Sequence, residues 1–288
     1  DWVLEPEKHF ILNTLAIPET ELLEYGLLAE DTNIASDHLP RVMDIAETIT
    51  ESSVPVPNLE GWNLVGLPVI VEEPYYLSVF PNATEGTLFS FTVTYTPVSD
   101  FILGVGNWLH FHEENETTIT GTIVSEITIS LSQGWNLISG ASSSIDLNTV
   151  VDEDNLIVPG TVYAFEGNYV EAESLDPGHG YWIMSTGEGE ITLSTTASME
   201  RRVISVEPEK TNTLSLGKQT LYFGATVLEK DVLSYSLPPK PPAPARDIRF
   251  SGNTKLCTTD ECMIEVMNDG ESLILECDLK NGEDWELV

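Results

Sequence analysis

The sequence predicts a mainly β protein, with tandem antiparallel β-sandwich-like modules that follow a small α/β segment at the N-terminus. A repeated phrase and a strand-like alternation of apolar and polar residues lead to this prediction. No helical pattern of useful length appears inside the repeats. The connections between the expected strands are too short for crossover helices, so we expect antiparallel pairing.

The repeated phrase is Gly-Trp-Asn-Leu, which occurs at residues 61–64 and again at 134–137. Trp62 and Trp135 are 73 positions apart (135 − 62), and four further matched pairs follow at an offset of 74. We therefore expect one β module at 58–128 and a second at 129–206, with these two tryptophans buried at equivalent places. In the second phrase Trp135 and Leu137 should face one side of a strand, and Asn136 and Ile138 the other. The matched pairs are Thr87 and Thr161, Phe91 and Phe165, Tyr95 and Tyr169, and Trp108 and Trp182.

The charge of the chain is strongly acidic. It has 47 Asp and Glu against 12 Lys and Arg, which gives a net charge of −35. Such a surface repels nucleic-acid phosphates and anionic lipid head groups and attracts cations such as calcium. We therefore expect no nucleic-acid binding by the β modules. No apolar run approaches the roughly 18 residues that a membrane span needs, so we expect no membrane span.

The first 50 residues contain a polar loop between short apolar segments. Residues 10–13 are typical of a strand, 18–25 of a short helix and 42–45 of a second strand. The loop before the second strand holds the adjacent residues Asp37 and His38. Their spacing alone favours a solvated loop histidine over an acid–base catalyst.

The loop sequence at residues 33–40, Asn-Ile-Ala-Ser-Asp-His-Leu-Pro, closely resembles the closing motif of the endonuclease/exonuclease/phosphatase family of metal-dependent, DNase-like enzymes. The resemblance covers residues 1–46 and implies two roles. His38 would act as general base on the attacking water or help to stabilise the phosphorane, and Asp37 would sit at the metal site. The implied metal is Mg²⁺ or Mn²⁺, with Ca²⁺ as a third candidate. The implied substrate is a phosphate ester of a nucleic acid, a lipid or a sugar.

The family's metal-binding glutamate and second catalytic histidine would precede Asp1. By this resemblance, residues 1–50 are the C-terminal remnant of a catalytic domain in a secreted or surface-attached phosphodiesterase or phosphatase. We expect the chain alone to be an inactive fragment of that hydrolase. The β modules resemble those of secreted Bacteroidetes-like bacterial proteins, which implies an extracellular or cell-surface location and an attachment or binding role. The alternative is a non-catalytic binding or adhesion module, for example for polysaccharide.

Three groups of residues in the modules could carry chemistry, and each has a structural alternative. His110 and His112 could chelate a metal from one strand face, but exposed strand histidines are favoured because no third ligand is identifiable. The residues Asp-Glu-Asp-Asn at 152–155 offer oxygen ligands for calcium, yet a solvated turn is favoured. Five aromatic residues could form a sugar-stacking platform, although the repeat match favours a core role for the tryptophans. They are Tyr75, Tyr76, Trp108, Tyr181 and Trp182.

Two proline-containing segments are predicted to connect parts of the chain. Residues 52–57 are expected to be a linker at a domain boundary. Residues 237–244 are expected to be a stiff spacer within a C-terminal β region at 207–288, with a ligand for an aromatic groove as the alternative. Strands expected at 247–250, 263–266 and 273–279 should pack on the segment before the prolines. Residues 214–224 are a faint third echo of the repeat.

All three cysteines lie in this C-terminal region, at Cys257, Cys262 and Cys277. A disulfide between the first two would close a small loop, and one between the last two would cross strands. Both pairings leave one thiol, and either would favour an oxidising compartment.

Overall fold

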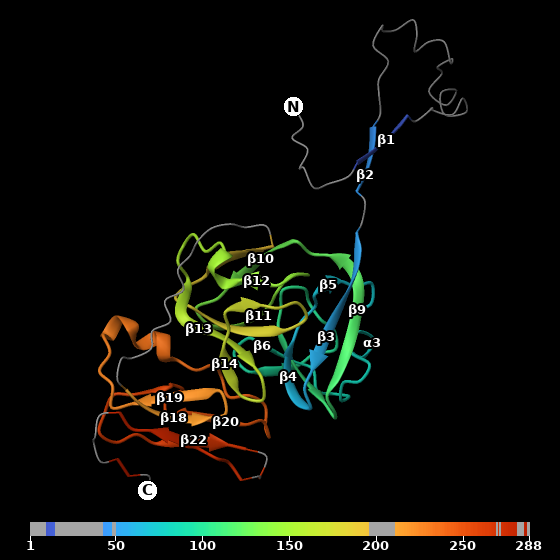
Figure 1. Cartoon of the computed structure of the whole chain (residues 1–288). Helices are drawn as coiled ribbons and strands as arrows, with labels where there is room; N and C mark the ends of the chain where they lie inside the picture. The colour runs from blue at the N-terminus through green and yellow to red at the C-terminus, as the bar shows by residue number, and fades with distance from the viewer. Residues whose placement is uncertain are drawn as a thin grey trace, which may run out of the picture. The chain divides into compact units, whose positions relative to one another are not determined.

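The computed structural model describes residues 50–195, 211–268, 270, 272–280 and 285–286, together with the backbone of 10–14 and 43–47. The chain divides into two compact units, Asp1–Thr50 and Glu51–Val288 (Figure 1). The described elements are almost entirely strands, and all but one of the described strand pairs are antiparallel, which confirms the prediction of a mainly β fold.

In the first unit, strand β1 (Phe10–Thr14) pairs antiparallel with strand β2 (Met43–Glu47) along its whole length. These are the two strands that the sequence predicts on either side of the polar loop. The helix predicted at 18–25 lies outside the described residues.

The first repeat folds as two sheets. One has four strands in the order β4-β8-β6-β7, and the other has three strands in the order β3-β9-β5. Residues 89–97 form a hairpin, in which β6 and β7 pair antiparallel. The elements are β3 (Glu51–Asn58), β4 (Gly61–Val65), β5 (Val69–Ile70), α3 (Tyr76–Val79), β6 (Phe89–Phe91), β7 (Tyr95–Pro97), β8 (Asn107–Phe111) and β9 (Asn115–Ile123).

The second repeat has the same four-stranded sheet, in the order β11-β16-β13-β14, and its outer strands β10 and β17 pair as β3 and β9 do in the first repeat. Matched strands therefore occupy matched positions, as an internal repeat requires. The elements are β10 (Glu126–Leu131), β11 (Gly134–Ser139), β12 (Ile145–Asp146), η1 (Leu147–Thr149), β13 (Ile157–Phe165), β14 (Tyr169–Glu171), β15 (Ser174–Leu175), β16 (Gly180–Ser185) and β17 (Gly189–Ser194).

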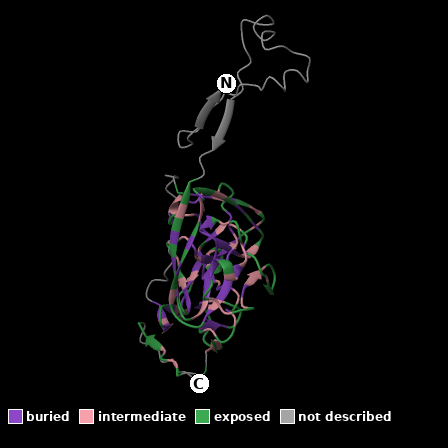
Figure 2. Cartoon of the chain, turned by 90° about the vertical axis from the view of Figure 1, so that its right-hand side faces the viewer, coloured by how far each residue is buried: buried purple, intermediate pink, exposed green. Residues whose placement is uncertain are grey.

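Each repeat has an apolar core, rich in aliphatic side chains, between its two sheets. Val56, Val65 and Leu109 are buried in the first core, and their repeat equivalents are buried in the second. Figure 2 shows buried residues running through the interior of the second compact unit, Glu51–Val288, which we call the β unit. Burying aliphatic side chains on one face of each sheet supplies most of the driving force for this packing. The equivalents in the second repeat are Ile129, Ile138 and Ile183.

The asparagine of the repeated phrase holds a turn closed in both copies. The Asn63 side chain accepts a hydrogen bond from Leu59 N (2.9 Å) and donates to the carbonyl oxygens of Leu59 (2.8 Å) and Gly61 (3.0 Å). Asn136 makes the same three bonds to Ser132 and to its own preceding glycine, at 2.9, 2.8 and 3.0 Å. The two glycines have φ values of 90° and 95°, a backbone region that favours glycine. The phrase is therefore a turn-closing device as well as a strand start.

The tryptophan of the phrase packs against a second tryptophan of its own repeat. The rings of Trp62 and Trp108 are 6.4 Å apart at 88°, and those of Trp135 and Trp182 are 6.3 Å apart at 86°. The predicted equivalence of Trp62 and Trp135 is therefore confirmed. The burial predicted for these two tryptophans is only partial, since both are half-buried, whereas Trp108 and Trp182 have no exposed surface.

The other face of each four-stranded sheet belongs to an aromatic core that the two repeats share. The Trp108 ring lies 4.8 Å from Phe165 of the second repeat. Reciprocally, the Trp182 ring lies 4.7 Å from Phe91 of the first repeat. Because Phe91 and Phe165 are themselves matched, the repeats contact each other as the subunits of a symmetric dimer do.

Backbone bonds across this junction follow the same symmetry. Gly66 N donates to Gly178 O at 3.0 Å, and the matched Ser139 N donates to Gly104 O, also at 3.0 Å. A Cβ added at Gly66 would lie 2.2 Å from Ser139 Cβ, so this approach requires a glycine. The two modules are consequently fused through backbone and core contacts.

Residues 52–57 are not a linker, and that part of the prediction is wrong, although the two compact units do divide next to them, between Thr50 and Glu51. They lie within β3, which pairs with β9 along its entire length. Val54 and Val56 point into the first core, whereas Pro55 and Pro57 are exposed. Proline is tolerated because β3 is an edge strand and needs no donors on its outer side.

The C-terminal part contains two further sheets, with strand orders β21-β19-β18-β23 and β20-β22. Strands after the prolines pair with strands before them, as the sequence predicts. The third echo at 214–224 is not a repeat, because its two strands form a hairpin with each other, unlike β10 and β11. The elements are β18 (Asn212–Leu216), β19 (Gln219–Phe223), η2 (Glu229–Tyr235), β20 (Asp247–Phe250), β21 (Leu256–Cys257), β22 (Ile264–Met267) and β23 (Glu276–Asp278).

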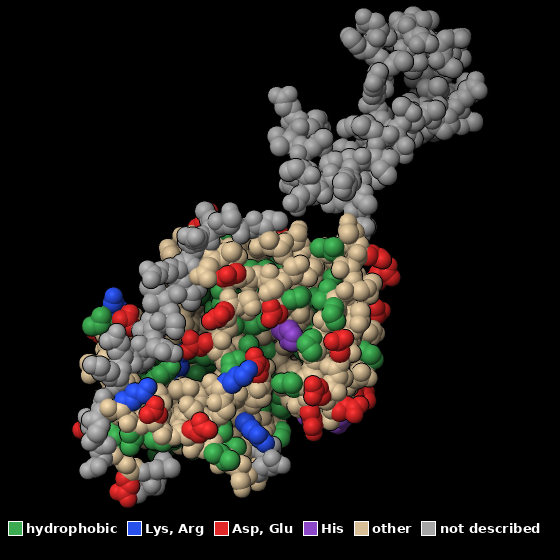
Figure 3. Space-filling view, in the orientation of Figure 1, with side chains coloured by type: hydrophobic (Ala, Val, Ile, Leu, Met, Phe, Trp, Pro, Cys, Tyr) green, Lys and Arg blue, Asp and Glu red, His purple; other side chains and the backbone are tan. Residues whose placement is uncertain are grey.

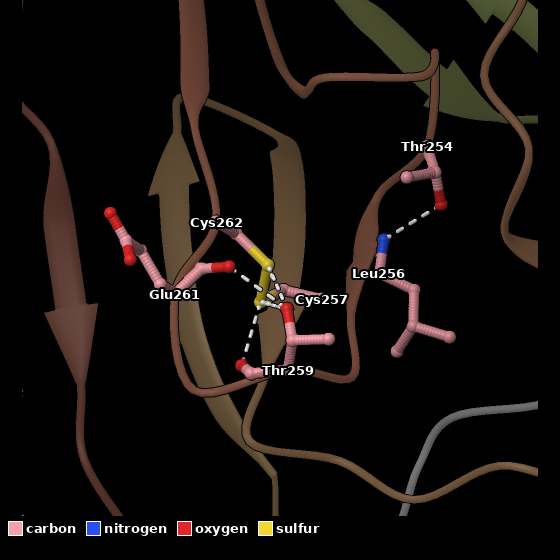
Figure 4. The surroundings of a disulfide bond; sticks show 6 residues. All are labelled: Thr254, Leu256, Cys257, Thr259, Glu261 and Cys262. Atoms are coloured by element: carbon pink, nitrogen blue, oxygen red, sulfur yellow. Dashed lines mark hydrogen bonds between the residues drawn. A yellow bond between two sulfur atoms is a disulfide. The ribbon is translucent and has the colours of Figure 1, made fainter.

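A disulfide joins Cys257 to Cys262, with a Cα–Cα distance of 6.1 Å (Figure 4). Of the two pairings considered from the sequence, the structure therefore has the one that closes the small loop. Cys277 is an exposed free thiol. Thr259 Oγ1 lies inside the loop and donates to Glu261 O at 2.8 Å. The bridge therefore closes a compact turn between β21 and β22.

Candidate functional site

Asp37 and His38, the predicted catalytic and metal-site residues, lie outside the described residues. The described strands β1 and β2 flank their loop in the sequence. Within the described part of the chain, no three His, Cys, Asp or Glu side chains come together as a metal-ligand group.

His110 and His112 lie close together, with ring centroids 5.7 Å apart. The Nδ1 atom of His110 is 2.9 Å from Thr84 Oγ1, and its ring contacts Trp62 edge-on at 5.2 Å. Burial, followed by the neighbouring His112, lowers the pKa of His110, so its neutral form is favoured. His112 is exposed. The pair is a packed strand histidine beside a solvent-facing one.

The acidic stretch at 152–155 is a turn. The Asp152 carboxylate accepts hydrogen bonds from the backbone N–H groups of Leu156 (2.7 Å) and Ile157 (3.0 Å). Asn155 has a φ of 53°, which asparagine tolerates better than most residues. Both carboxylate oxygens at position 152 thus hold the following strand, in agreement with the predicted turn.

The proposed sugar-stacking platform is not a surface. Trp108 and Trp182 are fully buried, and Tyr76 and Tyr181 are 4% and 3% exposed. The hydroxyl groups of these two tyrosines accept bonds from the backbone N–H groups of Gly86 and Asp176, both at 2.7 Å. Tyr75 alone is half-buried. The core role predicted for the tryptophans is confirmed.

A site that sequence reasoning missed lies where the proline-rich segment meets the repeats. We call residues 237–244 the strap, and Trp62, Tyr95, Tyr163 and Tyr169 the aromatic face. Three side chains of this face donate hydrogen bonds to strap carbonyl oxygens. They are Tyr95 to Lys240 (2.7 Å), Tyr169 to Pro239 (2.6 Å) and Trp62 Nε1 to Ala243 (3.2 Å).

The strap is therefore packed against the domain, and its predicted role as a spacer is wrong. Leu237, Pro238 and Pro241 are buried, whereas Lys240 and Pro244 are exposed. The alternative considered from the sequence, a ligand for an aromatic groove, describes this arrangement. The signals were the proline run and the matched tyrosines, but nothing in the sequence joined them.

Burial keeps the tyrosines of the aromatic face protonated. It raises the pKa of Tyr95 to about 12 and raises the pKa values of Tyr163 and Tyr169 well above the ordinary value. Each hydroxyl therefore remains a hydrogen-bond donor at neutral pH. Tyr163 uses this donor on Ser236 O, at 3.3 Å, just before the strap.

A buried ion pair holds the other side of the strap. Arg249 has no exposed surface and Asp247 is 1% exposed. Arg249 Nε and Nη2 donate to the two carboxylate oxygens of Asp247, at 2.5 and 2.9 Å. Its Nη1 donates to Pro238 O at 2.8 Å and to Asn253 Oδ1 at 2.9 Å. This bidentate geometry fixes the guanidinium, which in turn fixes the strap backbone.

Among the charged side chains on one face of the β unit, the acidic ones prevail. Figure 3 shows Asp and Glu side chains spread over the visible face and outnumbering Lys and Arg. Among the described residues, none of the helices has the length and apolar character needed to cross a membrane.

Comparisons with protein-family models, with curated proteins and with solved structures found no match for this chain.

Proposed function

We propose that the chain is the C-terminal portion of a secreted or surface-attached, metal-dependent phosphoric ester hydrolase of the endonuclease/exonuclease/phosphatase family. The observation that carries this proposal is the Ser-Asp-His phrase in the loop at 33–40. The antiparallel pairing of the flanking strands β1 and β2 supports it, because the phrase then lies in a connection anchored at both ends. Residues 51–288 serve as a non-catalytic unit for attachment or binding.

In this proposal, the two predicted residues divide the chemistry. A histidine side chain ordinarily titrates near neutral pH, and in this role His38 takes a proton from the attacking water. Asp37 supplies a carboxylate oxygen of the kind that Mg²⁺, Mn²⁺ and Ca²⁺ bind. When bound, such an ion neutralises charge on the phosphate. One carboxylate is too few for this ligand shell, so the intact parent protein must complete it.

The experiment compares the parent protein with the isolated chain. We expect the parent to hydrolyse a phosphate ester with Mg²⁺ or Mn²⁺ and to lose that activity on His38→Ala. The matched control is His110→Ala, a histidine of the β unit, which should retain activity. The isolated chain should be inactive with Mg²⁺, Mn²⁺ or Ca²⁺, because lone catalytic groups without their shell lose most of their effect.

Two results would contradict this proposal. A parent protein that keeps full activity after His38→Ala would remove the assigned role. Metal-dependent turnover by the isolated chain, abolished by His38→Ala, would show that these residues complete the site themselves.

An extracellular or cell-surface location belongs to the same proposal. The Cys257–Cys262 disulfide supports it, because disulfides persist in oxidising compartments. The net charge of −35 supports a β unit that does not bind nucleic acid.

The second candidate is a non-catalytic binding module, and one observation favours it. The aromatic face holds an extended segment through side-chain donors, which is the chemistry of peptide recognition. A polysaccharide ligand has less support, because the aromatic residues suggested for stacking are mostly in the core.

A further inference from the structure

The strap offers the aromatic face a particular kind of ligand. Proline has no backbone N–H, so the carbonyl oxygens are the backbone groups that a partner can recognise in such a segment. Proline also loses little conformational freedom on binding, because its ring already fixes φ. A row of tyrosine and tryptophan donors is therefore well suited to read it.

The donors are arranged about the junction of the two repeats. Tyr95 and Tyr169 are matched residues, and they donate to the adjacent carbonyl oxygens of Lys240 and Pro239. The pseudo-symmetry of the repeats thus places two equivalent hydroxyl groups at the centre of the strap. Trp62, from the first repeat, adds a third donor further along, at Ala243.

The recognising groups and the recognised segment come from different parts of the fold. The aromatic face belongs to the repeats, whereas the strap lies between η2 and β20 of the C-terminal part. Trp62, Tyr95 and Tyr169 are held by the repeats' shared aromatic core. Ring contacts within the repeats therefore help to position the face, together with the buried strap residue Leu237, which belongs to the same core.

The charge of the site selects among proline-rich segments. Lys240 lies at the centre of the strap with its side chain 48% exposed, and its Nζ atom is 2.6 Å from Glu265 Oε2. A surface with a net charge of −35 attracts a basic segment and repels an acidic one.

We propose that the aromatic face is a binding site for proline-rich segments with a central basic residue, which the strap occupies in cis. When the strap is released, the same site takes such a segment from a second polypeptide. This inference does not depend on hydrolase activity. It assigns the β unit a class of protein ligand, recognised through its carbonyl oxygens and its lysine or arginine.

The test uses the full chain and a labelled peptide with the sequence of residues 236–245. In the wild type the tethered strap competes at an effective concentration in the millimolar range, so the peptide should bind weakly. The double variant Pro238→Gly, Pro241→Gly loosens the strap at its two buried prolines. We expect it to bind the peptide at least about tenfold more tightly than the wild type does, measured by fluorescence anisotropy.

The donors are tested within the same loosened variant. Adding Tyr95→Phe and Tyr169→Phe removes two hydroxyl donors with little change in shape, and should weaken peptide binding by about fivefold or more. Adding Tyr75→Phe is the matched control, because this half-buried tyrosine packs on Tyr76 at 5.2 Å, and should leave binding unchanged.

Two results would overturn the proposal. The first is that the loosened variant binds the peptide no more tightly than the wild type does. The second is that removing both hydroxyl groups from the loosened variant leaves its affinity for the peptide unchanged. If the loosened variant does not fold, the wild type decides. The indole N–H of Trp62 donates to Ala243 O, so millimolar peptide should shift its NMR resonance as the strap is displaced. A resonance that stays in place at saturating peptide would reject the site.

Discussion

Replacing Arg249 with methionine should strongly destabilise the β unit. The side chain is fully buried and makes four hydrogen bonds, two of them to the buried Asp247 carboxylate. Methionine fills much of the space but leaves this carboxylate without its partner and Pro238 O without its donor. Removing one member of a buried pair costs about 3–5 kcal/mol. That is a large fraction of the roughly 5–15 kcal/mol that stabilises an ordinary domain.

The double variant Asp247→Leu, Arg249→Met should be more stable than Arg249→Met alone, because it leaves neither charge of this pair buried without its partner. The measurement is equilibrium unfolding in urea for the wild type and the three variants. Lys218→Met is the control, since Lys218 and Glu166 form a surface pair with side chains 70% and 48% exposed. It should change the free energy of unfolding by no more than about 1 kcal/mol. A cost below about 1 kcal/mol for Arg249→Met would refute the reasoning.

Three further predictions follow from the described contacts. Asn63→Ala and Asn136→Ala each lose three hydrogen bonds, so each should lower the free energy of unfolding by about 2–4 kcal/mol; a much smaller cost at either site would contradict the equivalence of the two turns. Alkylation of the non-reduced protein should label Cys277 alone, as detected by mass spectrometry, and labelling of all three cysteines would argue against the bridge. Cys262→Ser should lower the free energy of unfolding in urea by about 2 kcal/mol. Burial raises the pKa of Tyr95 to about 12. The protonated phenol therefore contributes its full stabilisation below the unfolded pKa, near 10, and this stabilisation is lost as the pH rises through 12. In urea unfolding at alkaline pH, the free energy of unfolding of Tyr95→Phe should fall less steeply with pH than that of the wild type.

The parts of the fold that were predictable from the sequence are those encoded locally or by repetition. Alternation of apolar and polar residues predicts the strands, because side chains on a strand point to opposite faces. The fixed offset predicts that Trp108 and Trp182 share one environment, and both are fully buried. It does not distinguish them from Trp62 and Trp135, which lie at the edge of the same core.

The strap contact and the edge strand were not predicted, for different reasons. Docking of Lys240 on Tyr95 joins residues 145 positions apart, and local patterns carry no information about such a contact. In β3, the alternation of Val54 and Val56 with prolines was visible, but the prolines outweighed it in the interpretation. Proline excludes a central strand but permits an edge strand. The prolines therefore indicated where the strand lies in the sheet, and they did not indicate that the strand was absent. The roles of Asp37 and His38 stay predictions, because both lie outside the described residues.

The exchange of aromatic side chains between the repeats has a consequence for how the protein unfolds. Phe165 covers Trp108 and Phe91 covers Trp182, so loss of either repeat would expose the buried indole of the other. Neither copy can open without an apolar cost to its neighbour, which couples their unfolding. The repeats should therefore melt in a single calorimetric transition, and two separated transitions would show that they are independent.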